Sequence, residues 1–173
     1  MNKGLETWVD EVAAITKPSN IHWVDGSQEE NDRLVAEMVA KGTLSRLNEK
    51  KYPNCYLHRS DQSDVARTEH LTFICSEKRE DAGATNNWMS PADAKAKVGP
   101  LFQGAMRDRT MYVIPYLMGP AGSPSSKVGV ELTDSPYVVA NMRIMTRMGD
   151  VAMKQLNGGG FVKGLHSLGD LSP

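Results

Sequence analysis

Cysteine is scarce in this sequence, which has only Cys55 and Cys75 among its 173 residues. Small secreted domains that depend on disulfide bonds contain many more, so such a scaffold is excluded and a reducing compartment is expected. The sequence has no Cys-x-x-Cys pair, and its four histidines lack the i, i+4 spacing of a helical metal pair. A zinc site is therefore not expected. Both cysteines lie in apolar segments, and we expect them to be buried and unreactive.

An excess of one charge is also absent, because 20 Lys and Arg residues oppose 21 Asp and Glu residues, for a net charge of −1. Binding to nucleic acid or to anionic membranes calls for a basic excess, so neither partner is expected. The most apolar stretch is MYVIPYLMG, much shorter than the roughly 18 residues of a membrane-spanning helix. The N-terminus has charges where a signal peptide needs apolar residues. These features predict a cytoplasmic chain.

Hydrophobic periodicity predicts an α/β fold in which a mixed, twisted β-sheet is flanked by helices. Helices are predicted at 5–17, from Ser27 to Gly42, after Ser90, after Asp134 and after Gly149. Strands are predicted at 21–24, 55–58, 71–75, 110–117, 128–132 and 161–168.

Three details of these elements can be checked against a structure. Ser27 and Glu30 have the spacing of a capping box. Pro115 indicates a bulge or an end in its strand, since proline cannot donate a ladder hydrogen bond. Met145 and Met148 continue the apolar face of the helix that follows Asp134.

A phosphate-binding loop of the G-x-x-x-x-G-K-[ST] type is missing, because the nearest candidate, GPAGSPSSK at 119–127, has no Gly-Lys pair. The segment SDQSDVARTE at 60–69 is more informative. Arg67 lies there between a polar turn and a predicted strand, where its planar guanidinium could bind a carboxylate or phosphate through two hydrogen bonds. An internal ion pair is the alternative, with Asp61, Asp64 or Glu69 as the partner. Local sequence leaves both interpretations open.

Longer motifs add a family resemblance. They read, in order, NIHWVDGSQEEN, YPNCYLHRSDQSDVARTE, TNNWMSP, RTMYVIPYLMGPAGSP, VGVELTDSPYVVANMRIMTRMG and FVKGLHSLG. From about residue 19 to residue 169 the chain resembles the N-terminal region of the GTP-dependent phosphoenolpyruvate carboxykinases. Ala105, Asp108 and Gly164 depart from the family pattern, which usually has Cys, Gly and Cys there. None of these departures falls in the DVAR segment at 64–67.

The resemblance implies an enzyme of gluconeogenesis that converts oxaloacetate and GTP to phosphoenolpyruvate, GDP and CO₂. It implies that Arg67 binds the substrate and that Glu69 contacts a mobile lid. It also implies Mn²⁺ as cofactor, with a second divalent metal carried by GTP. The family's metal ligands, phosphate loop, guanine pocket and lid come after the region that this chain resembles.

We therefore expect residues 1–173 to be an incomplete N-terminal, substrate-side domain that is inactive alone, from an enzyme that is usually monomeric. The rival hypothesis is a stand-alone binding module that kept the fold without catalysis. The DNA beyond codon 173 distinguishes them, because an open frame with a phosphate loop favours the fragment. If the chain is a fragment, the strands at 110–117 and 128–132 should need partner strands from outside it, and the isolated chain should self-associate.

Overall fold

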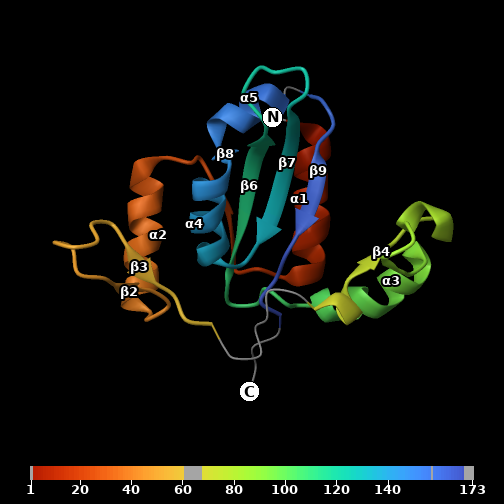
Figure 1. The fold of residues 1–173 in the computed structure, drawn as a ribbon, viewed down its shortest axis with the longest axis horizontal. Helices are drawn as coiled ribbons and strands as arrows, with labels where there is room; N and C mark the ends of the chain where they lie inside the picture. Colours follow the sequence, from red (N-terminus) through yellow and green to blue (C-terminus); the bar gives the residue numbers. More distant parts are fainter. Residues whose placement is uncertain (1, 61–67, 157, 170–173) are drawn as a thin grey trace.

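The computed structural model describes residues 2–60, 68–156 and 158–169, and these form a mixed β-sheet flanked by helices (Figure 1), as predicted. In sheet order, the strands are β1 (Asn20–Trp23), β6 (Thr110–Met118), β7 (Lys127–Thr133) and β9 (Val162–Leu165), and the short β8 (Arg147–Met148) also pairs with β6. The β1–β6 and β7–β9 pairs are parallel, whereas β6 runs antiparallel to β7 and to β8. None of the described helices is both long and apolar enough to cross a membrane.

Two helices cover one face of the sheet and form the larger core. α1 (Lys3–Thr16) and α5 (Asp150–Leu156) pack their apolar sides there. The buried members of this core are Leu5, Trp8, Val9, Val12, Met106, Met111, Val113, Leu117, Val128, Val130, Leu132, Ala152 and Leu156. Alternate residues of β6 and β7 point to this face because successive strand side chains alternate in direction.

The opposite face carries α4 (Pro136–Met145), with α2 (Gln28–Ala40) packed beside it. The smaller core on this side consists of Val24, Leu34, Tyr112, Ile114, Val139 and Met148. At the start of α2 the Ser27 hydroxyl accepts the Glu30 N–H at 3.1 Å, which confirms the predicted cap. The Glu30 carboxylate accepts the N–H of Gly26, at 3.0 Å, and not that of Ser27, because the Ser27 N–H donates to Asp25.

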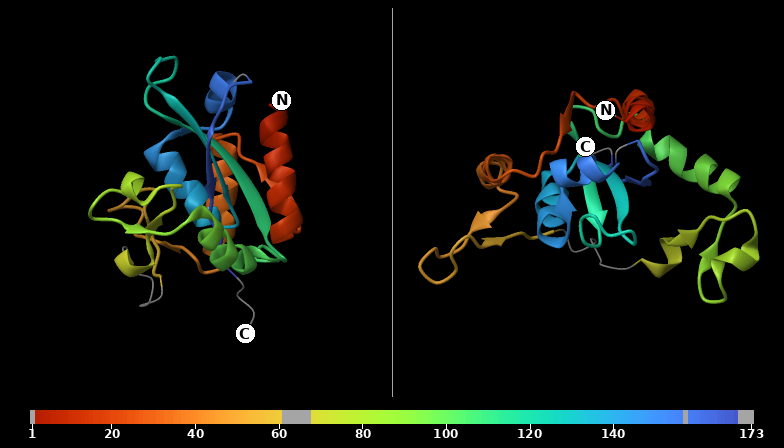
Figure 2. Two further views of the ribbon diagram at one scale, coloured as in Figure 1. Left: turned by 90° about the vertical axis from the view of Figure 1, so that its right-hand side faces the viewer. Right: turned by 90° about the horizontal axis from the view of Figure 1, so that it is seen from above.

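Two arms extend from opposite sides of the sheet and bend toward the face that carries α4 (Figure 2). One arm is a hairpin of β2 (Ser45–Arg46) and β3 (Tyr56–Leu57). The other contains the helical turns η1 (Glu69–Leu71), η2 (Arg79–Ala82) and η3 (Gly99–Phe102), the parallel strands β4 (Phe73–Ile74) and β5 (Asn87–Trp88), and the helix α3 (Pro91–Val98). The predicted strands at 55–58 and 71–75 are thus only two residues long.

Pro115 neither ends β6 nor forms a bulge, so this expectation is wrong. It pairs in register with Val130 of β7. Its carbonyl accepts the Gly149 N–H at 2.8 Å, on the side away from β7. The N–H and C=O groups of a strand residue point to the same side. The missing N–H therefore removes no hydrogen bond from the β6–β7 ladder, and β1 has already ended at Trp23.

The helical apolar face predicted after Asp134 is too long. α4 ends at Met145, which is 71% exposed. Met148 is buried, but it lies in β8, opposite Tyr116. The prediction that the strands at 110–117 and 128–132 take their neighbours from outside this chain is also wrong, because β1, β8 and β9 flank β6 and β7. Self-association of the isolated chain stays a prediction.

Candidate functional site

The segment that the sequence singles out is described by the structure only at its flanks. Arg67, together with the rest of 61–67, lies outside the described residues. Glu69 is described, and it begins η1 with an exposed side chain. The described neighbours of the segment are residue 60 on its N-terminal side and residue 68 on its C-terminal side.

On the N-terminal flank, His58 is held by two contacts. Its Nδ1 lies 2.8 Å from the carbonyl oxygen of Thr43. Its ring packs on the ring of Tyr137, with 4.1 Å between the centroids and 33° between the planes. Tyr137 is the second residue of α4, so the chain just before residue 61 is tied to the N-terminal end of a helix that packs on the sheet.

On the C-terminal flank, the backbone of η1 is fixed by side chains from the same arm. The Thr72 hydroxyl donates to the Thr68 carbonyl at 2.9 Å. The Asn87 amide, from β5, donates to the Glu69 carbonyl at 2.6 Å. Trp88 strengthens the arm by donating its indole N–H to the Ser76 carbonyl at 3.0 Å. The main chain of Glu69 is thus fixed while its carboxylate faces outward, an arrangement that suits contact with a separate element.

A buried carboxylate organises the end of the sheet from which α4 starts. Asp134 follows β7, and its side chain is fully buried. It accepts hydrogen bonds from Arg109 Nε at 2.9 Å, from the Ser167 hydroxyl at 2.8 Å and from the Leu168 N–H at 2.9 Å. In the sequence, Asp134 indicates only the start of a helix. A charged residue directly after an apolar strand was the available signal, but its partners lie 25 to 34 positions away.

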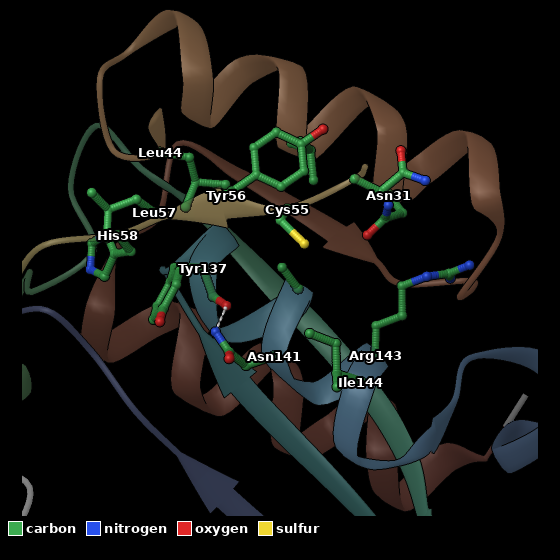
Figure 3. A pocket seen from close by; sticks show the side chains of 13 residues that line it. Asn31, Leu44, Cys55, Tyr56, Leu57, His58, Tyr137, Asn141, Arg143 and Ile144 are labelled. Carbon is green, nitrogen blue, oxygen red and sulfur yellow. Dashed lines mark hydrogen bonds between the residues drawn. The ribbon is translucent and has the colours of Figure 1, made fainter. Parts of the chain in front are cut away.

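A cavity of about 710 Å³ lies between α2, the β2–β3 hairpin and α4 (Figure 3). His58 and Tyr137 lie at one end of it and Arg143 at the other (Figure 3). The Arg143 guanidinium is already engaged, because it donates to the carbonyl of Ser27 at 3.0 Å and to the Gln28 amide oxygen at 3.1 Å. The cavity therefore adjoins the N-terminal flank of the candidate site.

The cysteines differ from expectation. Cys55 lines the cavity and is exposed, and Cys75 is exposed as well. Cys55 directly precedes β3 and Cys75 directly follows β4, both in the arms, and so neither is enclosed by the core. The prediction of buried cysteines is wrong because apolar neighbours in the sequence do not guarantee a position under the sheet.

Three histidines make local polar contacts. Besides the contact of His58, His22 Nε2 lies 2.6 Å from Glu30 Oε1, and His166 Nδ1 lies 2.8 Å from the Thr133 hydroxyl. Across the described ranges, no group of three or more His, Cys, Asp or Glu side chains could hold a metal ion. The resemblance places the family's manganese ligands after the region that this chain resembles, and the described residues offer no alternative metal site.

Comparison with known proteins extends the resemblance over nearly the whole chain. Residues 7–173 match the family described as the phosphoenolpyruvate carboxykinase N-terminal domain. The chain is 53% identical to the GTP-dependent phosphoenolpyruvate carboxykinase of Anaeromyxobacter dehalogenans strain 2CP-C, with 99% of this chain and 29% of that protein covered.

Two other relatives carry the same name. The protein of Renibacterium salmoninarum is 55% identical, with 97% of this chain and 28% of the relative covered. The protein of Chlamydia pneumoniae is 51% identical, with 99% of this chain and 29% of the relative covered. The chain thus spans less than a third of the length of these curated relatives. It belongs to the phosphoenolpyruvate carboxykinase N-terminal domain family.

Proposed function

We propose that this chain supplies the substrate-side part of a GTP-dependent phosphoenolpyruvate carboxykinase, with Arg67 as the residue that binds substrate. The observation that carries the proposal is the match over residues 7–173, together with relatives that are 51–55% identical and bear that enzyme's name. The DVAR segment at 64–67 lies within the matched region. Oxaloacetate and phosphoenolpyruvate are the proposed substrates, and the cytoplasm is the proposed location.

The proposed reaction has two steps. The bond between the departing carboxylate and its neighbouring carbon breaks, CO₂ leaves, and the electron pair stays behind as an enolate. The enolate oxygen then takes the γ-phosphoryl group of GTP, which gives phosphoenolpyruvate and GDP. Substrate and product are both anions, so a guanidinium suits either, because it presents parallel N–H donors to carboxylate or phosphate oxygens.

The flanks described above suit such a role for Arg67. A residue that orients a substrate must itself be held in place, since small displacements lower catalytic rates steeply. On the two sides of the segment, His58 and the η1 backbone are each held by side-chain contacts. Glu69, whose main chain is fixed and whose carboxylate faces outward, is the proposed contact for the mobile lid.

The metal ions would be bound outside the described residues, which contain no group of three or more His, Cys, Asp or Glu side chains that could hold one. Mn²⁺ and a second divalent ion carried with GTP would neutralise charge that develops during phosphoryl transfer. We propose that residues of the longer enzyme, beyond the region matched here, hold these metals and the nucleotide. The contribution of this chain is binding and orientation of the substrate.

A chimeric enzyme tests the proposal directly. The matched N-terminal region of the Anaeromyxobacter dehalogenans enzyme is replaced by this chain, and phosphoenolpyruvate formation from oxaloacetate is measured with GTP and Mn²⁺. We expect the chimera to be active because the two regions are 53% identical over 99% of this chain. A folded but inactive chimera, with the parent enzyme active in the same assay, would contradict the proposed function and favour a binding module.

The isolated 173-residue chain is expected to form no phosphoenolpyruvate under the same conditions. Phosphoryl transfer depends on positioned metals, and the described residues offer no group that could hold them. The measurement is the Mn²⁺- and GTP-dependent product signal above a buffer control. A reproducible signal that disappears in an Arg67→Ala variant would show that the chain is catalytically sufficient, contrary to this expectation.

A further inference from the structure

The face of the sheet that carries α4 is covered only in part. Val139 of α4 packs with Tyr112 and Ile114 of β6. Within the described ranges, no helix lies over β7 and β9 on this side, although α1 lies behind them (Figure 1) and packs its apolar side on β7. The two arms bend toward the same side and flank the uncovered strands (Figure 2). The half of this face formed by β7 and β9 therefore carries no helix among the described residues.

The register of β7 and β9 shows which residues lie on this half of the face. In the parallel β7–β9 pair, Gly129 lies beside Val162 and Glu131 beside Gly164. A Cβ atom at residue 164 would collide with Oε2 of Glu131, so the Glu131 carboxylate lies over the backbone of Gly164. We call the four residues Gly129, Glu131, Val162 and Gly164 the β7–β9 patch. The Tyr116 ring lies over Gly129 and the Glu131 carboxylate lies over Gly164, and Val162 is half-exposed. A partner would therefore meet these three side chains.

Glu131 is the only charged residue of the β7–β9 patch, and its environment is unfavourable for a lone anion. The residue is half-buried, and burial raises the pKa of its carboxyl group. Among the described residues, no hydrogen bond or ion pair reaches its carboxylate. Removing a carboxylate from water without a partner costs free energy, which an incoming cation would offset. Glu131 also acts on Tyr116 of β6, whose pKa is raised by burial and, to a smaller extent, by Glu131.

We propose that the β7–β9 patch is a docking surface for the polypeptide that follows the matched region in the GTP-dependent relatives, and that an arginine or lysine of this polypeptide pairs with Glu131. The inference rests on the proposed function for the identity of its partner. Two observations support this occupant. The relatives have more than two thirds of their length outside the matched region. The patch also combines an exposed apolar side chain, Val162, with a carboxylate that lacks a cation.

Carboxyl labelling tests the proposal. The isolated chain and the chimera are treated with a carbodiimide and an amine, and labelling of each acidic residue is followed by mass spectrometry. We expect Glu131 to react several-fold more slowly in the chimera than in the isolated chain. Glu11 on the exposed side of α1 is the matched control, and it should react at the same rate in both.

A Glu131→Gln substitution gives a second test, because it should shift the urea midpoint in opposite directions in the isolated chain and in the chimera. In the isolated chain, Glu131→Gln should raise the urea midpoint because it removes a carboxylate that burial disfavours. In the chimera the same change should lower the midpoint of the transition that includes this region, because it removes one partner of an ion pair. Glu11→Gln should leave both midpoints unchanged.

The pH dependence of the stability of the isolated chain tests whether Glu131→Gln raises its urea midpoint for the expected reason. Folding raises the pKa of the Glu131 carboxyl above its ordinary value of 4.5. Such a group makes its full contribution to the stability of the folded state at a pH below 4.5, and this contribution is lost as the pH rises through the pKa of the folded state. Wild-type chain should therefore lose stability relative to Glu131→Gln as the pH rises above 4.5.

The outcomes separate this inference from the proposed function. An active chimera in which Glu131 labels as fast as in the isolated chain would overturn the docking surface and leave the function standing. Protection of Glu131 in an inactive chimera would support the docking surface and contradict the function. Protection that grows with concentration of the isolated chain would assign the patch to a second copy and overturn the proposed occupant.

Discussion

Arg67→Lys in the chimeric enzyme is expected to lower kcat/KM for oxaloacetate by about ten- to hundredfold, the range that corresponds to loss of one charge-assisted hydrogen bond. Lysine keeps the positive charge but cannot present two parallel N–H donors to a carboxylate. The KM for GTP should change little, because Arg67 is proposed to bind the other substrate. Steady-state kinetics with each substrate varied in turn measures both quantities.

Arg79→Lys is the matched control, because Arg79 lies exposed in η2 of the same arm as Glu69. It should leave kcat/KM for oxaloacetate unchanged. If Arg67→Lys also has no effect, the arginine is not a substrate ligand, and its ion pair with Asp61, Asp64 or Glu69 becomes the better explanation. A parallel loss of GTP binding would instead indicate a general disturbance of the active site.

Asp134→Ala is expected to destabilise the isolated chain by about 3 kcal/mol, toward the lower end of the cost of breaking a buried ion pair, because Arg109 remains partly exposed. The change leaves the Arg109 guanidinium, the Ser167 hydroxyl and the Leu168 N–H without their shared acceptor. Urea unfolding of wild type and variant measures the difference in the free energy of unfolding.

Two variants make this measurement specific. Asp134→Asn keeps the shape and one acceptor oxygen, so its cost should fall between those of wild type and Asp134→Ala. Asp10→Ala, on the exposed side of α1, should change stability little. A loss of less than about 1 kcal/mol for Asp134→Ala, the worth of one ordinary hydrogen bond, would show that the Asp134 network is not a major support of this end of the sheet.

Asp134 also links stability to the candidate site. It directly precedes Ser135, whose hydroxyl caps α4, and Tyr137 in that helix packs on His58. A chimera with Asp134→Asn should therefore bind oxaloacetate more weakly, because the N-terminal flank of the 61–67 segment loses its support. A raised KM for oxaloacetate with an unchanged KM for GTP is the expected result.

Local sequence was sufficient to determine the main elements and the family. The apolar spacing of α1, the Ser27 cap and the apolar run of β6 each depend on residues within a few positions of one another. Such patterns act through neighbouring residues of one helix or strand, so they can be recognised without the fold. The family resemblance, and with it the hypothesis for Arg67, was also contained in contiguous motifs.

Tertiary structure decided the features that depend on which strand lies beside which. Pro115 is tolerated within a sheet strand because its missing N–H faces the end of β1 and not β7. Met148 is buried through pairing with β6, and not through the helical spacing that suggested it. Cys55 is exposed because its strand belongs to an arm and not to the sheet.

The same reason applies to Asp134 and Glu131, whose environments the local sequence does not reveal. The partners of Asp134 are Arg109 and Ser167, which belong to other segments, and the position of Glu131 over Gly164 comes from the pairing of β7 with β9. A carboxylate's energy depends on the water and the charges around it, and these are supplied by segments far away in the sequence. The sequence by itself determined the elements and the family of this protein, and only packing decided which of its charges are paired, buried or left facing outward.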